Sequence, residues 1–158
     1  MGADLYLESV FKPNFDHYNA SFEEWVQRRN SLQQAGNEVE AQTAQEKVEE
    51  FYEKMYERGY FRDSYNASNV LRLFGLSWWG DVMSILDDDG QLSPSDTQML
   101  LAMLHERESD FEANLAEEAA WEGWTKEQTD TYFRDKYERF KTFLEEAITL
   151  NEAIVCSV

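Results

Sequence analysis

Apolar residues recur at helical spacing along this sequence, over long stretches that hold almost no proline. Side chains three or four residues apart lie on the same side of an α-helix, so this spacing predicts helices with one buried face. Only Pro13 and Pro94 occur in the whole chain. The clearest stripe lies between residues 37 and 59 and consists of Val39, Ala44, Val48, Phe51, Tyr52, Met55 and Tyr56. The chain is therefore expected to be mainly helical.

Capping residues give the expected limits of these helices. Thr125 with Gln128 fits the capping-box pattern of a helix start, as does Ser21 with Glu24. Pro94 suits the first position of another helix. The predicted helices cover residues 21–35, 37–59, 67–74, 77–86, 93–115 and 125–150.

The two ends of the chain are predicted to pair as short strands. Residues 4–10 mix β-branched and aromatic residues with partial alternation, and the segment 12–14 (KPN) closes them. Residues 153–158 (AIVCSV) are the expected partner. The predicted fold class is thus mainly α (α+β): a single-domain helical bundle over 1–158, with about five to six helices and a terminal β-pair.

Length and composition place the chain among folded, single-domain proteins. With 158 residues, one hydrophobic core is the expectation, and 15% aromatic residues supply more burial than a disordered acidic tail would carry. The single cysteine, Cys156, excludes an internal disulfide and favours a reducing compartment, so cytoplasmic localisation is expected. No window approaches the ~20 apolar residues that cross a bilayer, so we expect no membrane association.

The acidic charge is concentrated in one part of the sequence. The formal net charge is −18, and residues 81–122 hold 12 acidic residues against one basic residue, Arg107. Such a field repels nucleic acid and attracts basic proteins, so we expect a basic protein partner and no direct nucleic-acid binding. The predicted acidic interaction face consists of Asp87, Asp88, Asp89, Glu106, Glu108, Asp110, Glu112, Glu117 and Glu118. The alternative is that this charge only keeps the chain soluble.

The acidic run 87–93 (DDDGQLS) invites comparison with a calcium-binding loop. Aligning Gly90 with the loop's invariant glycine places Ile85 where the first carboxylate belongs, and Asp96 where a bidentate glutamate belongs. An acidic turn between helices is therefore the favoured interpretation. With two histidines and one cysteine in the chain, we expect neither a metal nor a cofactor. No nucleophile motif occurs, so no catalytic residue is assigned.

A polar and aromatic cluster follows the second predicted helix. Arg62 offers a planar donor fork for an anion, and tyrosine and tryptophan rings offer stacking faces. A pocket for a planar or anionic small molecule is predicted from Tyr60, Arg62, Asp63, Tyr65, Asn66, Trp78 and Trp79. The alternative is that Arg62 and Asp63 form an internal salt bridge and that the tryptophans belong to the core.

A second tryptophan pair, Trp121 and Trp124, precedes the last predicted helix. Tryptophan is frequent at the hot spots of protein interfaces, so the pair is one candidate for an exposed anchor. The favoured interpretation is that Trp124 packs on the first turns of the helix as a hydrophobic staple.

Four short segments of the sequence are distinctive: residues 1–6 (MGADLY), 59–66 (GYFRDSYN), 76–79 (LSWW) and 156–158 (CSV). Together they resemble a family of uncharacterised proteins found in bacteria and their phages. The resemblance covers essentially the whole chain and implies no known activity, so no functional residue is transferred. It implies a bacterial or phage-encoded cytoplasmic protein, and hence a role in phage–host conflict.

Binding is favoured over catalysis as the function. The first hypothesis is a non-enzymatic acidic interaction protein, such as a phage-encoded inhibitor or DNA mimic, that occupies a basic surface on a partner. The alternative is a protein that binds or sequesters a nucleotide-like small molecule in the Arg/Tyr/Trp pocket. An enzyme that uses Asp63 or Asp81 as acid or base ranks last, because the sequence pairs neither with a nucleophile or a metal.

Overall fold

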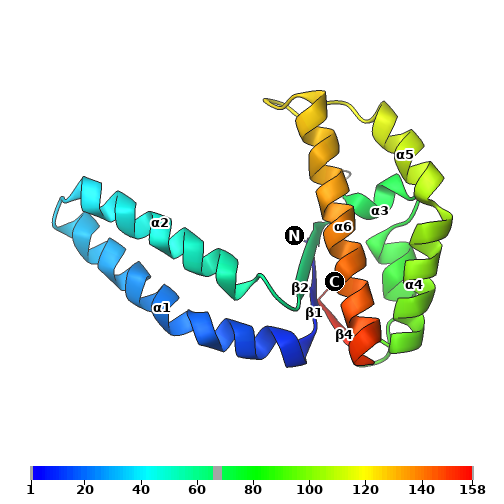
Figure 1. The fold of residues 1–158 in the computed structure, drawn as a ribbon, viewed down its shortest axis with the longest axis horizontal. Coiled ribbons are helices and arrows are strands. Elements are labelled where there is room, and N and C mark those ends of the chain that lie inside the picture. Colours follow the sequence, from blue (N-terminus) through cyan, green and yellow to red (C-terminus); the bar gives the residue numbers. More distant parts are fainter. Residues whose placement is uncertain (1, 66–68, 158) are drawn as a thin grey trace. The chain divides into compact units, whose positions relative to one another are not determined.

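The computed structural model describes residues 2–65 and 69–157, which form helices and a small four-stranded sheet (Figure 1). The prediction of a mainly α fold with a short β component is confirmed. The described residues divide into two compact units, residues 8–60 and residues 2–7 with those from 61 onward. Each unit is described by itself below, and the expectation of a single domain stays a prediction.

The unit of residues 8–60 is a pair of helices, α1 (Glu8–Gln34) and α2 (Glu38–Met55) (Figure 1). The turn between them uses Gly36 at a φ of +74°, a left-handed conformation that favours glycine. Asn37 then caps α2, because its side chain accepts a hydrogen bond from the Glu40 amide. The predicted helix over residues 37–59 is confirmed, with its end at Met55.

Polar and aromatic contacts join the two helices. The side-chain amide of Asn14 donates to the carbonyls of Lys54 and Met55 at 2.7 and 3.1 Å, which satisfies acceptors left open at the end of α2. The rings of Phe15 and Tyr56 meet edge to face with centroids 5.9 Å apart. These contacts set the helices side by side in antiparallel order.

The first helix begins much earlier than predicted. α1 starts at Glu8, so Ser21 lies inside the helix, and the capping box expected there is wrong. Pro13 also lies inside α1 instead of closing a strand. Its ring removes the N–H that would bond the carbonyl of Ser9, a cost that the contacts with α2 offset.

The sheet joins the two ends of the chain and has the strand order β2-β1-β4-β3. Its strands are β1 (Gly2–Tyr6), β2 (Tyr60–Ser64), β3 (Gln91–Leu92) and β4 (Ile154–Ser157). β1 and β4 are antiparallel, with Leu5 opposite Cys156. The predicted pairing of the two ends is therefore confirmed, whereas β2 and β3 were not expected.

Short helical turns connect β2 to β3. They are α3 (Val70–Leu73), the π-helical turn η1 (Trp78–Val82) and the 3₁₀ turn η2 (Met83–Ile85). Gly75 separates the first two at a φ of +69°, and the Ser77 hydroxyl accepts from the Gly80 amide at the start of η1. The helix predicted over 67–74 is present as the single turn α3, with residues 67–68 outside the described residues, and the helix predicted over 77–86 is divided into η1 and η2.

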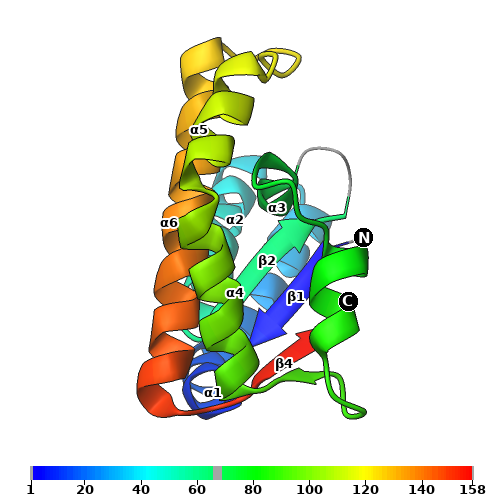
Figure 2. The same ribbon diagram turned by 90° about the vertical axis from the view of Figure 1, so that its right-hand side faces the viewer.

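Three longer helices complete the larger unit: α4 (Pro94–Glu106), α5 (Glu108–Glu117) and α6 (Lys126–Leu150). Figure 2 shows α4 and α5 following one another alongside α6. The predicted start at Ser93 is confirmed, because its hydroxyl accepts from the Asp96 amide at 3.2 Å. The single helix predicted over 93–115 is instead interrupted at Arg107, where φ is −107° and ψ is 15°.

The core of the larger unit lies between the sheet and α6. Phe61 of β2 stacks on Phe140 of α6 with ring centroids 4.6 Å apart, and Trp78 lies 5.6 Å from the same ring. Ala3 and Leu5 alternate along β1 and are fully buried, as expected for a strand with one covered face. The core thus fixes α6 against the strands, and α6 in turn positions the loop at its own start.

Candidate functional site

Two residues of the predicted small-molecule pocket, Asp63 and Trp78, lie together in the core. Their exposed fractions are 3% and 1%. The indole N–H of Trp78 donates to Asp63 Oδ2 at 2.9 Å, and the amide of Val70 donates to the same oxygen at 3.0 Å. Burial raises the pKa of the Asp63 carboxyl above its usual range, against the opposite effect of these hydrogen bonds. The pair ties β2 to η1 and to the start of α3.

Arg62 and Asp63, although adjacent in β2, have different partners. Successive side chains of a strand point to opposite faces of a sheet. Arg62 Nη1 lies 3.7 Å from Asp4 Oδ1 of the neighbouring β1, and the Arg62 carbonyl accepts from Lys136 Nζ at 2.7 Å. Arg62 therefore pairs along the exposed side of the sheet, while Asp63 bonds into the core.

The remaining predicted pocket residues are distributed over separate places. Tyr65 and Trp79 lie against each other with ring centroids 5.2 Å apart, and Trp79 is 60% exposed. Tyr60 belongs to the unit of residues 8–60, among its aromatic side chains. Asn66 lies outside the described residues. Among the described pocket residues, the structure thus brings together Asp63 with Trp78 and Tyr65 with Trp79.

The first part of the predicted acidic face is a tight turn before β3. The Asp87 carboxylate accepts from the amides of Asp89 and Gln91 at 3.0 and 2.8 Å, and the Gly90 amide donates to the Asp87 carbonyl. Asp87 therefore organises the turn, as aspartate commonly does. The Asp88 and Asp89 side chains are exposed. The interpretation as an acidic turn holds, although the turn leads into a strand and not directly into a helix.

Three carboxylates, one at the end of α4 and two along α5, are exposed to solvent. Glu106, Asp110 and Glu117 are exposed, and within residues 2–65 and 69–157 they form no ion pair. Asp110 and Glu117 are seven residues apart, which is nearly two helical turns, so they lie on the same side of α5. We call these three residues the acidic row.

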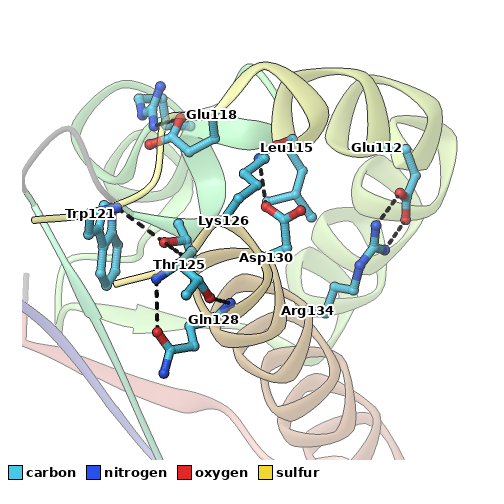
Figure 3. Close-up of polar contacts among 11 residues, drawn as sticks. Glu112, Leu115, Glu118, Trp121, Thr125, Lys126, Gln128, Asp130 and Arg134 are labelled. Carbon is cyan, nitrogen blue, oxygen red and sulfur yellow. Dashed lines mark hydrogen bonds and ion pairs between the residues drawn. The ribbon is translucent and has the colours of Figure 1, made fainter. Parts of the chain in front are cut away.

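Other members of the predicted acidic face are bound to neighbouring elements. The pairs are Glu108 with Tyr137, Glu112 with Arg134, and Glu118 with Arg72. Arg134 holds both carboxylate oxygens of Glu112 at 2.5 and 2.7 Å, and this contact lowers the pKa of the Glu112 carboxyl (Figure 3). The first two pairs border a hollow of about 570 Å³ between α5 and α6. The charges of Glu112 and Glu118 are therefore paired with arginines of the chain, whereas Glu108 keeps its charge and accepts a hydrogen bond from a neutral hydroxyl.

Hydrogen bonds fix the loop between α5 and α6 to the first turns of α6 (Figure 3). Lys126 Nζ donates to the Leu115 carbonyl at the end of α5 and to Asp130 Oδ1 at 2.7 Å. The Trp121 amide donates to the Thr129 hydroxyl at 3.2 Å. The loop is thus anchored on both sides.

A capping box and a tight turn set the direction of Trp124. The Thr125 amide donates to Gln128 Oε1 at 2.8 Å, and the Gln128 amide donates to the Thr125 hydroxyl at 3.1 Å, which confirms the predicted capping box (Figure 3). Just before it, the Trp124 amide donates to the Trp121 carbonyl at 2.9 Å. Gly123 makes this turn possible at a φ of +80°.

The two tryptophans of this turn differ in their surroundings. Trp121 is half-buried and lies 5.3 Å from the Phe133 ring and 4.8 Å from the Tyr132 ring of α6. Trp124 is 45% exposed and meets Tyr132 edge to face at 6.0 Å. Trp121 therefore provides most of the packing on the first turns of α6 that was expected of Trp124.

An open trough of about 440 Å³ lies beside Trp124 on the exposed side of α6. Its lining residues are Trp124, Glu127, Gln128, Thr131, Tyr132 and Asp135. Sequence analysis missed this site. The signal was present, because the lining residues repeat every four positions in two rows, and such residues share one helix face.

Two kinds of site are missing from residues 2–65 and 69–157. No three ligand-type side chains gather there to hold a metal ion, and no helix is both long and apolar enough to cross a membrane. The thiol of Cys156 is half-buried in β4, and burial raises its pKa to about 12. This thiol is therefore protonated at neutral pH.

The acidic row, the α5–α6 loop and the trough are the features on which a function of this chain can rest. The acidic row provides solvent-facing carboxylates, and the trough provides an open site that is lined in part by aromatic rings. No family model matches the chain, and no curated protein or solved structure matches it at a significant level.

Proposed function

We propose that this chain is a non-enzymatic acidic interaction protein that occupies a basic surface on a partner protein. The observation that carries the proposal is the acidic row of Glu106, Asp110 and Glu117. These carboxylates are exposed and form no ion pair within the described part of the chain. A carboxylate without a cation inside its own chain is available to a cation on another molecule.

The residues around the acidic row do not neutralise it. Residues 106–135 hold ten acidic and three basic residues, a net charge of −7. Two of these bases, Lys126 and Arg134, are already paired with Asp130 and Glu112 in this fully described segment. The remaining field attracts polycations at long range and weakens as salt screens it.

A DNA mimic is the more specific form of this proposal. Asp110 and Glu117 are separated by about 10 Å along the axis of α5, because each helical residue rises ~1.5 Å. Carboxylates held at intervals on a helix resemble a row of phosphates to a basic, nucleic-acid-binding surface. From the resemblance to bacterial and phage proteins, we further propose that this inhibitor is of phage origin and acts in the cytoplasm of a bacterial cell.

The alternative, a protein that binds a nucleotide-like small molecule, has less support. Its candidates Asp63 and Trp78 are bonded to each other in the core. Arg62, Tyr65 and Trp79 remain at least partly exposed. These three could stack on and pair with an anionic ligand, and they are the residues to mutate if a small bound mass is found.

The test is affinity capture of the tagged protein from a lysate of the organism that encodes it. Capture is done at about 50 mM and about 500 mM NaCl, and the eluates are identified by native mass spectrometry. The wild-type protein is expected to retain a stoichiometric basic protein at low salt and to release it at high salt. A variant with Glu106→Gln, Asp110→Asn and Glu117→Gln is expected to retain much less.

A matched control separates the acidic row from net charge. The variant with Glu24→Gln, Glu38→Gln and Glu46→Gln removes three exposed carboxylates from α1 and α2, so both triple variants have the same net charge. The control is expected to behave as the wild type. Elution of the wild-type protein alone, or equal losses in the two triple variants, would contradict the proposal.

A further inference from the structure

The trough at the start of α6 combines two aromatic rings with two carboxylates. The rings of Trp124 and Tyr132 stand at 84° to each other with centroids 6.0 Å apart, so they form two walls of a corner. Glu127 and Asp135 line the same trough and are exposed. Aromatic faces attract organic cations through the ring quadrupole, and carboxylates attract them by charge. The four groups therefore favour the same class of ligand.

One of these rings already receives an ammonium group within the chain. Lys136 Nζ lies 5.4 Å from the Tyr132 ring centroid and is held by its hydrogen bond to the Arg62 carbonyl. Lys136 is not among the residues that line the trough. Lys136 therefore shows that the Tyr132 ring attracts an ammonium group, and this ammonium group is not part of the trough lining.

The trough is held in shape before any partner arrives. The turn closed by the Trp124 amide and the Trp121 carbonyl precedes an exposed indole, and the capping box fixes Gln128, which lines the trough. A site that is ordered in advance loses less conformational entropy on binding. Trp124, at 45% exposure, is thus a fixed aromatic surface open to solvent.

We propose that this trough receives a lysine or arginine side chain of the basic partner. The inference rests on the proposed function, and it names one contact within that interaction. A cationic side chain can contact both aromatic rings of the trough by cation–π interaction and is attracted by both of its carboxylates. A neutral or anionic side chain leaves Glu127 and Asp135 without a counter-charge. The charge of residues 106–135 brings the cation to the surface, and the trough gives it a defined position.

The test uses the full chain and two peptides, an oligo-arginine peptide and the same peptide with citrulline in place of arginine. Citrulline keeps the shape of arginine and lacks its charge. Binding is followed by the NMR shifts of the tryptophan indole N–H groups. The indole of Trp124 is expected to shift with the arginine peptide, and the citrulline peptide is expected to bind far more weakly.

Two variants locate the contact. Trp124→Ala is expected to weaken binding of the arginine peptide about tenfold, which corresponds to about 1.4 kcal/mol. Trp79→Ala is the matched control, because Trp79 is the other strongly exposed tryptophan, and it is expected to bind as the wild type. The double variant Glu127→Gln/Asp135→Asn is expected to lose affinity without loss of fold, since both side chains are exposed.

The outcomes distinguish this inference from the proposed function. Peptide binding that is unchanged by Trp124→Ala, with no shift of that indole, overturns the trough contact and leaves the acidic row as the binding surface. Equal binding of the citrulline peptide shows that the trough does not select cations and overturns the inference. Self-association that Trp124→Ala abolishes would place a second copy there and overturn it too. Absence of peptide binding at low salt overturns the trough contact, whereas the proposed function is decided separately by the capture of a basic partner protein.

Discussion

A single carboxylate, Asp63, connects three elements of the larger unit. It projects from β2 and accepts hydrogen bonds from Trp78 in η1 and from the first amide of α3, at Val70. Each of these donors is in the interior, where a lost acceptor costs about 1–3 kcal/mol per group. Asp63 is therefore a structural residue, and the proposed interaction surface would depend on it only through the fold.

The buried carboxyl of Asp63 makes a testable contribution to the pH dependence of stability. Its pKa is raised above the ordinary value of 3.8, so the folded chain binds the proton more tightly than the unfolded chain. The stabilisation that comes from this tighter proton binding is fully present at pH values below the pKa of Asp63 in the unfolded chain. It is lost as the pH rises through the pKa of Asp63 in the folded chain. Asp63→Asn has no such titration. The difference in unfolding free energy, wild type minus variant, is expected to fall over this window.

Urea unfolding followed by tryptophan fluorescence, between about pH 4 and pH 7, measures this difference. Groups that titrate in both proteins cancel in the comparison. A difference that increases with pH would mean that hydrogen bonding outweighs burial at this carboxyl.

At the residue scale, the sequence indicated which residue types matter but not their partners. Arg62 and Asp63 are adjacent, so an internal salt bridge was a reasonable alternative. In β2 their side chains leave the strand on opposite faces, and each finds a partner far away in the sequence. That outcome depends on the five-residue strand β2. Its sequence shows no strong alternation of apolar and polar residues that would predict a strand.

At the element scale, the capping box of α6 supports both the helix and the trough beside it. Thr125→Ala removes the hydroxyl that accepts from the Gln128 amide, and it is expected to lower the unfolding free energy by about 1 kcal/mol. Thr125→Ser keeps the hydroxyl and is expected to lie close to the wild type. Urea unfolding checks both variants, and equal stability of all three proteins would show that the cap contributes nothing.

Replacement of Pro13 in α1 is expected to raise the unfolding free energy, whereas Thr125→Ala is expected to lower it. The residue lies inside the helix, where proline removes a hydrogen bond and crowds the preceding turn. Pro13→Ala is therefore expected to stabilise the unit of residues 8–60 by about 1–3 kcal/mol. Thermal unfolding followed by circular dichroism tests it, with Gln27→Ala as a control at an exposed position of the same helix. A lower midpoint for Pro13→Ala would show that the proline is needed where it stands.

Local signals predicted several of the helix starts that carry a side-chain cap. Ser93 and Thr125 were identified because a hydroxyl and the residues after it form a recognisable pattern, and both caps are present. Ser21 shows the same pattern inside α1, where the helix had already begun. The long contact with α2 overrides both that pattern and the break expected at Pro13. A pattern of residues within one segment cannot include the stabilisation that comes from contacts with another helix.

At the scale of the whole molecule, the pairing of the chain's two ends was predictable, whereas the helical spacing of the trough's lining residues did not reveal which of the two tryptophans faces it. Two short apolar segments at opposite ends had no other evident partners in a helical chain, and they pair as β1 and β4. The trough requires knowing that Trp121 turns inward while Trp124 turns outward. That difference arises from one tight turn at Gly123 and from the packing of α6, and composition gives no sign of it.

The measurement that tests the central claim most directly is the salt dependence of the dissociation constant for the captured basic partner. It compares the wild type with the variant of the acidic row (Glu106→Gln/Asp110→Asn/Glu117→Gln) and with the control variant of α1 and α2. The account predicts that affinity falls steeply with NaCl for the wild type and the control, and that the slope is reduced only in the variant of the acidic row. The same slope for all three proteins would contradict the account.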